Sequence, residues 1–407
     1  MYTFSLPQGQ VGVGANSIAS ILAGTSAFQQ QSVGVVGTFG STIKNFGNVT
    51  YIDPNLKNPQ AQQYTLTVER QVSRWLFRGG YSGSKATYLQ RTQLLNLIAP
   101  GLYTIPTTLA QQQQEQAAGV FSAVYNGSNT AFTTPSNRID PRFNRVSVVG
   151  SSANSSYNSL QLYAERRFAD WYAFTVAYTW SKSIDDASDA LGVLANDTPN
   201  QQDPLHNRNN RSVSQFDVPR RIAITHDFVS SFKGIKNGMA RYVVNGWEFS
   251  GIFQAQTGLP VNLFAGTVAG VTDGLLIGYN ATTYPQRPDL VGSLNIPFQP
   301  NPGGANPNLI TNSGLAQPLI GHLGTLGRNV IRANPLIESD MTVGRIFKLK
   351  PERMSLKLQA QVFNVFNNTT FSFGSAVNNL SSPATFGYYS GTDTNTRRIA
   401  LTGRLSW

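Results

Sequence analysis

Residues 171–181 read WYAFTVAYTWS, and this stretch decides the fold class. Its even positions carry large side chains, namely Tyr172, Phe174, Val176, Tyr178 and Trp180, whereas the odd positions from Ala173 to Ser181 are small. Because successive side chains of a strand point to opposite faces, this pattern predicts a strand with one face toward lipid. Its length fits the roughly 9 to 11 residues of a tilted membrane strand, and aromatic residues at both ends fit the two membrane interfaces.

The same period of two recurs along the chain. Residues 354–362 alternate an apolar face with a strongly polar one. Weaker or shorter series occur at Tyr64, Leu66 and Val68, at Trp75, Phe77 and Tyr81, at Trp247, Phe249 and Phe253, and at Ile399, Leu401, Leu405 and Trp407. Each series alone would also fit a soluble β-sandwich, so the fold class depends on how the strands are spaced.

The connections between these strands alternate between short and long. Short turns are expected at Val72–Arg74, Ala169–Asp170 and Lys350–Glu352, with a moderate connection at Phe232–Asn245; long polar stretches are Gln93–Ser156, Lys182–Asp217, Gly258–Glu338 and Asn367–Thr396. Sandwiches seldom space their turns so unevenly, whereas outer-membrane barrels have short periplasmic turns and long extracellular loops. The sequence therefore predicts an all-β protein, an antiparallel transmembrane outer-membrane β-barrel in the bacterial cell envelope.

The composition excludes several other classes of protein. The chain of 407 residues is 13% charged and has no cysteine, which removes thiol catalysis, Cys-ligated zinc and disulfides. No apolar run approaches the roughly 18 residues that a membrane helix needs. The net charge of +11 would permit nucleic-acid binding, but the basic residues are scattered, so no nucleic-acid partner is expected.

The alternation of loops also gives the chain a direction. The last strand follows a long loop, so it is expected to run toward the periplasm and to leave Trp407 at that interface. About nine strands can be counted, whereas single-chain bacterial barrels have an even number. A further strand at Ser32–Phe39, in an otherwise irregular segment 1–50, or a missing start would restore the parity. The first residues, MYTFSLPQGQVGVG, lack the features of a secretory signal, which favours a fragment.

Several ordered motifs resemble one known family. They are DPNLKNPQAQQYTLTVER from Asp53, GYSGSKATYL from Gly80, NSSYNSLQLYAERRF from Asn154, AYTWSKSIDDASD from Ala177, FDVPRRIAITH from Phe216, NGWEFSGIFQAQTGLP from Asn245, GRNVIRANPLIESDMTVGRIFKL from Gly327 and LQAQVFNVFNNTTF from Leu358. Together with the terminal aromatic residue, they are similar to the C-terminal half of Oar-like TonB-dependent transporter barrels of the acidobacterial type. The resemblance covers roughly residues 51–407, with weaker similarity in the long loops.

This resemblance implies a larger parent protein. The family has a signal peptide, an N-terminal carboxypeptidase-regulatory-like domain, a plug inside a 22-stranded barrel and a segment that contacts TonB; none of these is visible in this sequence. Residues 51–407 would then be the C-terminal portion of such a barrel, with the plug absent and TonB acting only through a missing N-terminal region. The resemblance also implies that Trp407 serves as the recognition signal for the barrel assembly machinery.

Three acidic residues, Asp185, Asp186 and Asp189, follow a predicted strand on the long-loop side. Carboxylates in such a cluster could ligate calcium, but the glycine and spacing of an EF-hand loop are absent. A solvated loop is therefore the favoured interpretation, and the cluster is a weak candidate cation site.

Two histidines have nearby carboxylates. His206 follows Asp203, and His226 precedes Asp227, an arrangement that a hydrolase could use to orient an imidazole. A nucleophile motif such as G-x-S-x-G is missing. The sequence therefore predicts no enzymatic activity and no cofactor.

Four basic residues, Arg353, Lys357, Arg398 and Arg404, are expected on the polar face of the last strands, toward the barrel lumen. Pairing with acidic residues of a plug or of neighbouring strands is the favoured interpretation. The alternative is a basic lining that attracts acidic solutes through its long-range field.

The sequence thus favours a transporter-type outer-membrane barrel that contacts lipid with its outer face and an unidentified extracellular ligand with its loops. Its substrate could be a siderophore, a glycan, a peptide or a secreted protein, and nothing in the sequence selects one. The alternatives are a structural or adhesive barrel, and a truncated gene product without independent transport.

Overall fold

The computed structural model describes residues 48–94, 106–118, 139–140, 143, 145–169, 171–188, 202–203, 206–265, 267–268, 271–272, 286–296, 299–300, 313–350, 354–372, 379–380, 382, 385–389, 391–392 and 396–407. Within these residues the protein is almost entirely β-structure. The helices are α2 (Leu109–Ala117), the 3-10 helix η3 (Asn207–Asn210) and α4 (Gly238–Val244). No helix among the described residues has the length and apolar character needed to cross a membrane.

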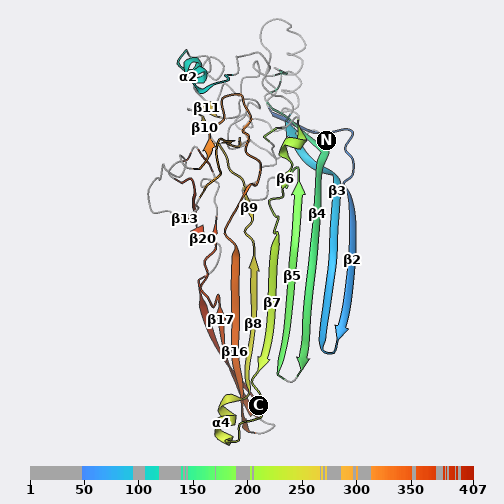
Figure 1. Cartoon of the computed structure of the whole chain (residues 1–407), viewed down its shortest axis with the longest axis vertical. Coiled ribbons are helices and arrows are strands. Elements are labelled where there is room, and N and C mark those ends of the chain that lie inside the picture. The colour runs from blue at the N-terminus through green and yellow to red at the C-terminus, as the bar shows by residue number, and fades with distance from the viewer. Residues whose placement is uncertain are drawn as a thin grey trace, which may run out of the picture.

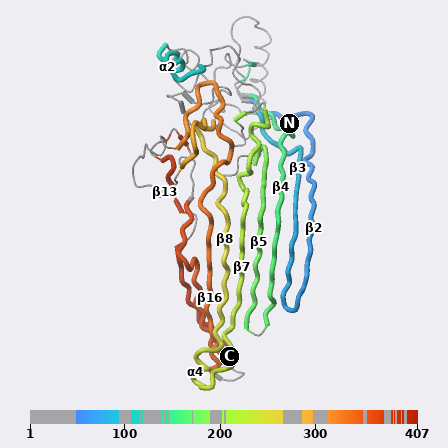
Figure 2. The backbone as a smooth tube through the Cα atoms, viewed as in Figure 1, coloured from blue at the N-terminus to red at the C-terminus, as the bar shows by residue number. Residues whose placement is uncertain are grey.

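Nine long strands form one antiparallel meander in which the order in space follows the order in the chain. They are β2 (Gln60–Val72), β3 (Trp75–Leu94), β4 (Arg145–Ala169), β5 (Tyr172–Asp185), β7 (Arg220–Val229), β8 (Trp247–Gln256), β16 (Leu336–Lys350), β17 (Met354–Phe363) and β21 (Arg398–Ser406). The colours of Figure 2 therefore pass from blue to red across the sheet. The predicted antiparallel sheet and its count of nine strands are confirmed among the described residues.

The two ends of the sheet differ as the sequence predicts. The tight connections β2–β3, β4–β5 and β16–β17 lie at one end, together with α4 and the C-terminus (Figure 1). The long connections lie at the other end. The end with the tight turns is called the short-turn end below, and the other the loop end.

Side-chain alternation divides the sheet into two faces. On the outer face, the row through Val176 contains Phe77, Ala164, Ile224 and Phe253, which lie opposite one another on neighbouring strands. On the inner face, the next row runs through Arg78, Tyr163, Ala177, Ala223, Gln254 and Glu338. The register thus carries the alternation of residues 171–181 across the sheet and gives an apolar outer face and a polar inner face.

One predicted boundary is wrong. Residues 93–156 were expected to be a long polar connection, but β4 already begins at Arg145 and pairs with β3 as far as Leu94. At about 3.3 Å per residue, a strand of 25 residues is much longer than a membrane requires. Its loop-end half lies beyond the lipid-facing part of the sheet. There β1 pairs with it and Ser147, Val148 and Ala153 are buried, so the alternation of a membrane strand does not mark it in the sequence.

The meander ends in two strand edges. β2 and β21 each pair with one neighbour in the sheet, and they are not paired with each other in the part of the chain described. Every position of β2 is exposed. A short strand, β1 (Asn48–Ile52), runs parallel to the loop-end part of β4. The predicted strand Ser32–Phe39 lies outside the described residues.

The buried hydrophobic cluster of the described residues lies in the loops and not on the sheet. Short strand pairs tie the loops together: β9 (Pro260–Val261) with β15 (Ile331–Arg332), β10 (Thr267–Val268) with β11 (Val271–Thr272), β12 (Asp289–Leu290) with β14 (Leu315–Ala316), β13 (Gln299–Pro300) with β19 (Tyr388–Tyr389), β18 (Phe371–Ser372) with β20 (Gly391–Thr392), and β6 (Ser212–Val213) with β5. A buried cluster joins Leu263, Leu315, Leu326, Leu380, Phe386 and Tyr388. We call the described residues of these loops, 202–218, 257–335 and 364–397, the loop cap.

Candidate functional site

The inner face presents polar and charged side chains to the interior side of the sheet. Glu69 and Arg78 lie directly opposite each other on β2 and β3 and form an ion pair at 2.6 Å. Lys357 of β17 reaches across β16 to Glu248 of β8, with Nζ 3.1 Å from the carboxylate. These pairs are half exposed, so each contributes at most about 1 kcal/mol to the stability of the folded protein. Their main effect is to make the inner face polar.

The predicted basic residues that the structure describes share this inner face. Arg404 lies directly opposite Lys357 on the neighbouring strand. Arg398 lies opposite Phe363, and its guanidinium is 5.8 Å from the centre of that ring. Arg353 lies outside the described residues. Lys357 therefore has an acidic partner, as the interpretation of paired charges expects. Lys357, Arg398 and Arg404 also form a basic strip along β17 and β21, as the interpretation of a basic lining expects.

Two buried ion pairs fasten the loop cap to the loop end of the sheet. Arg328 binds the carboxylate of Asp185 at the end of β5, and it also donates to the Asp185 carbonyl at 3.0 Å. Arg332 binds the carboxylate of Asp217 and donates to its carbonyl at 2.9 Å. Both carboxylates are almost fully buried. A buried ion pair of this kind is held by several hydrogen bonds, because each charge has lost its water.

These two pairs bring together three of the quoted motifs. Arg328 and Arg332 belong to GRNVIRANP, Asp185 to SIDDASD and Asp217 to FDVPRR. The sequence analysis considered Asp185 as a cation ligand and did not consider either arginine. The pairing spans more than a hundred residues, so no local pattern could reveal it.

The acidic cluster near the end of β5 has protein partners. Asp185 is bound by Arg328 and by the hydroxyl of Ser188. Asp186 accepts hydrogen bonds from the backbone and side-chain amides of Asn154 at 3.1 and 3.0 Å. Asp189 lies outside the described residues. Among the described residues no group of three metal-ligating side chains occurs, and the cation site stays a prediction.

The two histidines lie in different surroundings. His206 holds Nδ1 3.0 Å from a carboxylate oxygen of Asp203, and this carboxylate also accepts from Asn209 at 2.7 Å. The imidazole itself is largely exposed and Asp203 is buried, which is the geometry of a loop anchor. His226 lies on the outer face opposite Gly251, and its neighbour Asp227 lies on the inner face. The predicted absence of enzymatic activity stays a prediction.

Two arginines of the loop end are buried deeply. Burial and the positive charge of Arg328 lower the pKa of Arg287 to about 10, although Asp203 attracts its charge. Arg287 still donates to the carbonyls of Leu326 and Asn209, at 2.7 and 3.2 Å. Burial likewise lowers the pKa of Arg91 to about 10, although Asp186 and Asp203 attract its charge. The three guanidinium nitrogens of Arg91 have no hydrogen-bond partner within the described part of the structure.

Replacing Arg91 by methionine is expected to stabilise the loop end by about 1–4 kcal/mol, because an apolar side chain of similar length avoids burying a charge. The lowered pKa means that the folded state carries this penalty at every pH below about 10 and loses it only as the pH rises above that value. The measurement is the rate of trypsin cleavage in the loop end near neutral pH. Arg211→Met, at a half-exposed site, is the control. Faster cleavage of Arg91→Met would contradict the prediction, and would mean that the attraction of Asp186 and Asp203 for the charge outweighs the cost of burying it.

Trp407 follows β21 at the short-turn end and is 90% exposed (Figure 1). If it is an assembly signal, Trp407→Ala is expected to lower the amount of heat-modifiable protein in the outer-membrane fraction several-fold. Trp407→Phe keeps a terminal aromatic residue and should assemble like the wild type. Equal assembly of all three proteins would remove the proposed role of Trp407.

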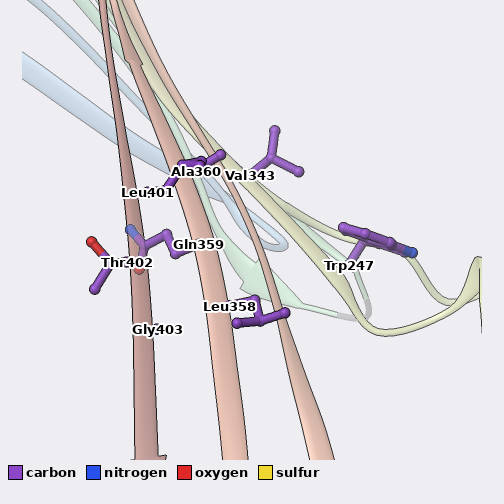
Figure 3. A pocket seen from close by; sticks show the side chains of 8 residues that line it. All are labelled: Trp247, Val343, Leu358, Gln359, Ala360, Leu401, Thr402 and Gly403. Carbon is purple, nitrogen blue, oxygen red and sulfur yellow. The ribbon is translucent and has the colours of Figure 1, made fainter.

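The outer face has a shallow apolar hollow of about 380 Å³ near the short-turn end. It is lined by Trp247, Val343, Leu358, Gln359, Ala360, Leu401, Thr402 and Gly403 (Figure 3). The register places Val343, Ala360 and Leu401 in one outer-face row. The hollow therefore faces lipid, and the inner wall and the loop cap are the better candidates for contact with a solute.

Three solved structures of outer-membrane proteins are similar to the chain. The chain is similar to the outer membrane transporter YddB from Escherichia coli, with 11% identity and a TM-score of 0.42 over 90% of this chain and 35% of that one. It is similar to the ferripyoverdine receptor of Pseudomonas aeruginosa, with 8% identity and a TM-score of 0.39 over 86% and 27%. For the FrpB iron transporter from Neisseria meningitidis the values are 11%, 0.35, 88% and 33%. The chain thus spans about a third of these structures or less.

No curated protein sequence matches the chain. The profile of the outer membrane beta barrel domain matches residues 4–400, which is nearly the whole chain. Its two-faced antiparallel sheet belongs in the outer membrane of bacteria. The chain is a member of the outer membrane beta barrel domain family.

Proposed function

We propose that the chain is the C-terminal portion of a TonB-dependent transporter barrel that passes an unidentified solute across the outer membrane. The proposal rests on the differences between the two faces of the sheet and between its two ends. Its outer face is apolar, its inner face is polar with charges of both signs, and its loop end carries a folded cap. Such a wall and such a cap provide a wet passage and a surface for first contact.

The motifs that resemble Oar-like transporters support the same reading. They supply the buried pairs Asp185–Arg328 and Asp217–Arg332, which hold the loop cap at the loop end of the sheet. A receptor needs loops of defined shape, because ordering flexible loops on binding costs free energy. A plug, a signal for export and a segment that contacts TonB would be supplied by an N-terminal region.

The strand edges support a larger barrel. Within lipid, every backbone amide and carbonyl must be hydrogen-bonded, so the outward edges of β2 and β21 need partner strands. We propose that upstream strands of the same protein fill the gap and complete a barrel of 22 strands. The basic strip of Lys357, Arg398 and Arg404 would then face an aqueous lumen and favour acidic solutes.

Transport can be tested without knowing the solute. The gene is deleted and restored in its host, and the solutes removed from a complex medium are compared by mass spectrometry with and without a protonophore. Transport predicts at least one solute whose removal requires both the gene and the proton-motive force. If no solute depends on the gene, while adhesion or envelope integrity does, the protein is a structural barrel.

A further inference from the structure

The connection between β7 and β8 is unlike the tight turns beside it. It runs from Ser230 to Gly246 and contains α4, which projects at the short-turn end (Figure 1). Asn237 caps the start of this helix by accepting hydrogen bonds from the amides of Met239 and Ala240. The helix is therefore a defined element and not an extended turn.

Two side chains of the outer face hold α4. The indole nitrogen of Trp247 donates to the carbonyl of Val243 at 2.8 Å. The guanidinium of Arg345 donates to the same carbonyl at 3.0 Å and also binds the carbonyl of Tyr242. Arg345 is opposite Trp247 in the register, so both side chains leave the sheet on its apolar face. The last turn of α4 is thus attached to the lipid side of the wall and not to the lumen side.

Aromatic rings surround the Arg345 guanidinium. Its central carbon is 4.8 Å from the ring centre of Tyr242, 5.4 Å from that of Trp247 and 4.9 Å from that of Phe347. Cation–π contacts and carbonyl acceptors together allow this charge to sit at the border of the apolar face. Tyrosine and tryptophan side chains are also those preferred at the level of lipid headgroups.

The exposed surface of α4 and of the segment before it is apolar. Phe232 is 50% exposed, Met239 is 78% exposed and Tyr242 is 59% exposed. Beside them lies a hollow of about 710 Å³, lined by Trp171, Ser231, Phe232, Lys233, Gly234, Ile235 and Val244. This apolar surface continues the outer face of the sheet at its short-turn end, where Trp171 packs against Phe228 and Phe228 against Phe249.

All charged residues in the connection between β7 and β8 are basic. Residues 230–246 contain Lys233, Lys236 and Arg241 and no acidic residue. All three basic side chains are exposed. Apolar side chains and a cationic fringe on one short amphipathic element are the features that bind anionic lipid at a membrane surface.

We propose that α4 and residues 231–237 form a binding site for anionic phospholipid of the periplasmic leaflet. Phe232, Met239 and Tyr242 enter the border of the acyl region, and the hollow beside Trp171 receives one lipid. Lys233, Lys236 and Arg241 bind its phosphate and the headgroups around it. The proposal goes beyond transport, because it fixes the depth of the barrel in the membrane whatever solute passes.

The absence of cysteine allows a direct test. The full chain with Met239→Cys carries one environment-sensitive fluorophore and is reconstituted in phosphatidylcholine vesicles. The vesicles contain the same fraction of a spin-labelled lipid quencher with either a phosphatidylglycerol or a phosphatidylcholine headgroup. We expect the phosphatidylglycerol quencher to be about threefold more effective at low salt. Most of this preference should be lost in 0.5 M NaCl, where the Debye length is only roughly 4 Å.

A triple variant removes the three basic side chains of the connection between β7 and β8. Lys233→Gln, Lys236→Gln and Arg241→Gln together should make the two quenchers equally effective. The matched control, Lys57→Gln, Lys85→Gln and Lys182→Gln, removes the same charge from exposed positions away from α4 and should keep the preference. Circular dichroism of the reconstituted protein, which does not depend on barrel closure, shows that each variant keeps its β-sheet.

Two outcomes would overturn the proposal. Equal quenching by both lipids in the labelled Met239→Cys protein, with its three basic residues intact, would mean that α4 enters the membrane without selecting a headgroup. Quenching by neither lipid would mean that α4 lies outside the membrane, with its apolar surface left for a periplasmic protein. Both results leave the transport proposal untouched, because they concern only the depth and lipid contacts of the short-turn end.

Discussion

Arg328→Met is expected to destabilise the loop cap by about 3–5 kcal/mol. The substitution leaves the carboxylate of Asp185 buried without its cation, and it also removes the hydrogen bonds to the Asp185 carbonyl and the Ser188 hydroxyl. The β-sheet should remain, because none of its ladder bonds is touched. The measurement is hydrogen exchange of the amides in residues 183–188 and 326–332, which should become much faster.

Two further variants separate the buried ion pair from a general loss of charge. Arg78→Met breaks a half-exposed pair on the inner face and should cost less than about 1 kcal/mol. Asp185→Leu combined with Arg328→Met removes both buried charges, so part of the lost protection should return. Unchanged exchange in Arg328→Met would show that the pair does not hold the cap.

A charge on the outer face should have the next largest effect. Val176→Arg places a guanidinium midway between Trp171 and Trp180, the aromatic residues at the two ends of the strand. Such a charge at the bilayer midplane costs about 2–4 kcal/mol in an outer-membrane barrel. We expect a lower yield of heat-modifiable protein and a lower urea midpoint for unfolding from phospholipid vesicles.

The adjacent residue supplies the matched control. Ala177→Arg introduces the same side chain at the same depth, but on the inner face, in the row of Arg78 and Gln254. It should lower the free energy of unfolding by about 1 kcal/mol or less, since the inner face is polar. Equal destabilisation by the two variants would mean that the assignment of the faces is wrong.

The sequence predicted the sheet because the membrane imposes a local rule. Within the wall, each strand must alternate lipid-facing and polar side chains, so the pattern from Tyr172 to Trp180 was sufficient to assign faces. The same rule located the tight turns and the direction of the last strand. The prediction failed where this rule no longer applies, as in the loop-end part of β4 from Arg145 to Ser156, which lies beyond the lipid-facing part of the sheet.

The candidate site was less predictable, because it depends on contacts between distant parts of the chain. Asp185 and Asp186 are neighbours in the sequence, but β5 ends at Asp185, and the two carboxylates bind different partners. Arg345 was not assigned to either face from the sequence. Its position on the apolar face makes sense only once α4 supplies carbonyl acceptors.

The meander and the loop cap impose different demands on the order of folding. Each long strand pairs with the next one in the chain, so hairpins can form one after another at low loop-closure cost. The pair Asp185–Arg328 instead joins residues 143 positions apart. We therefore expect the cap to close after β5, β7 and β8 have paired. Slow, late closure of the cap should be the last kinetic phase of folding, separable from insertion of the wall.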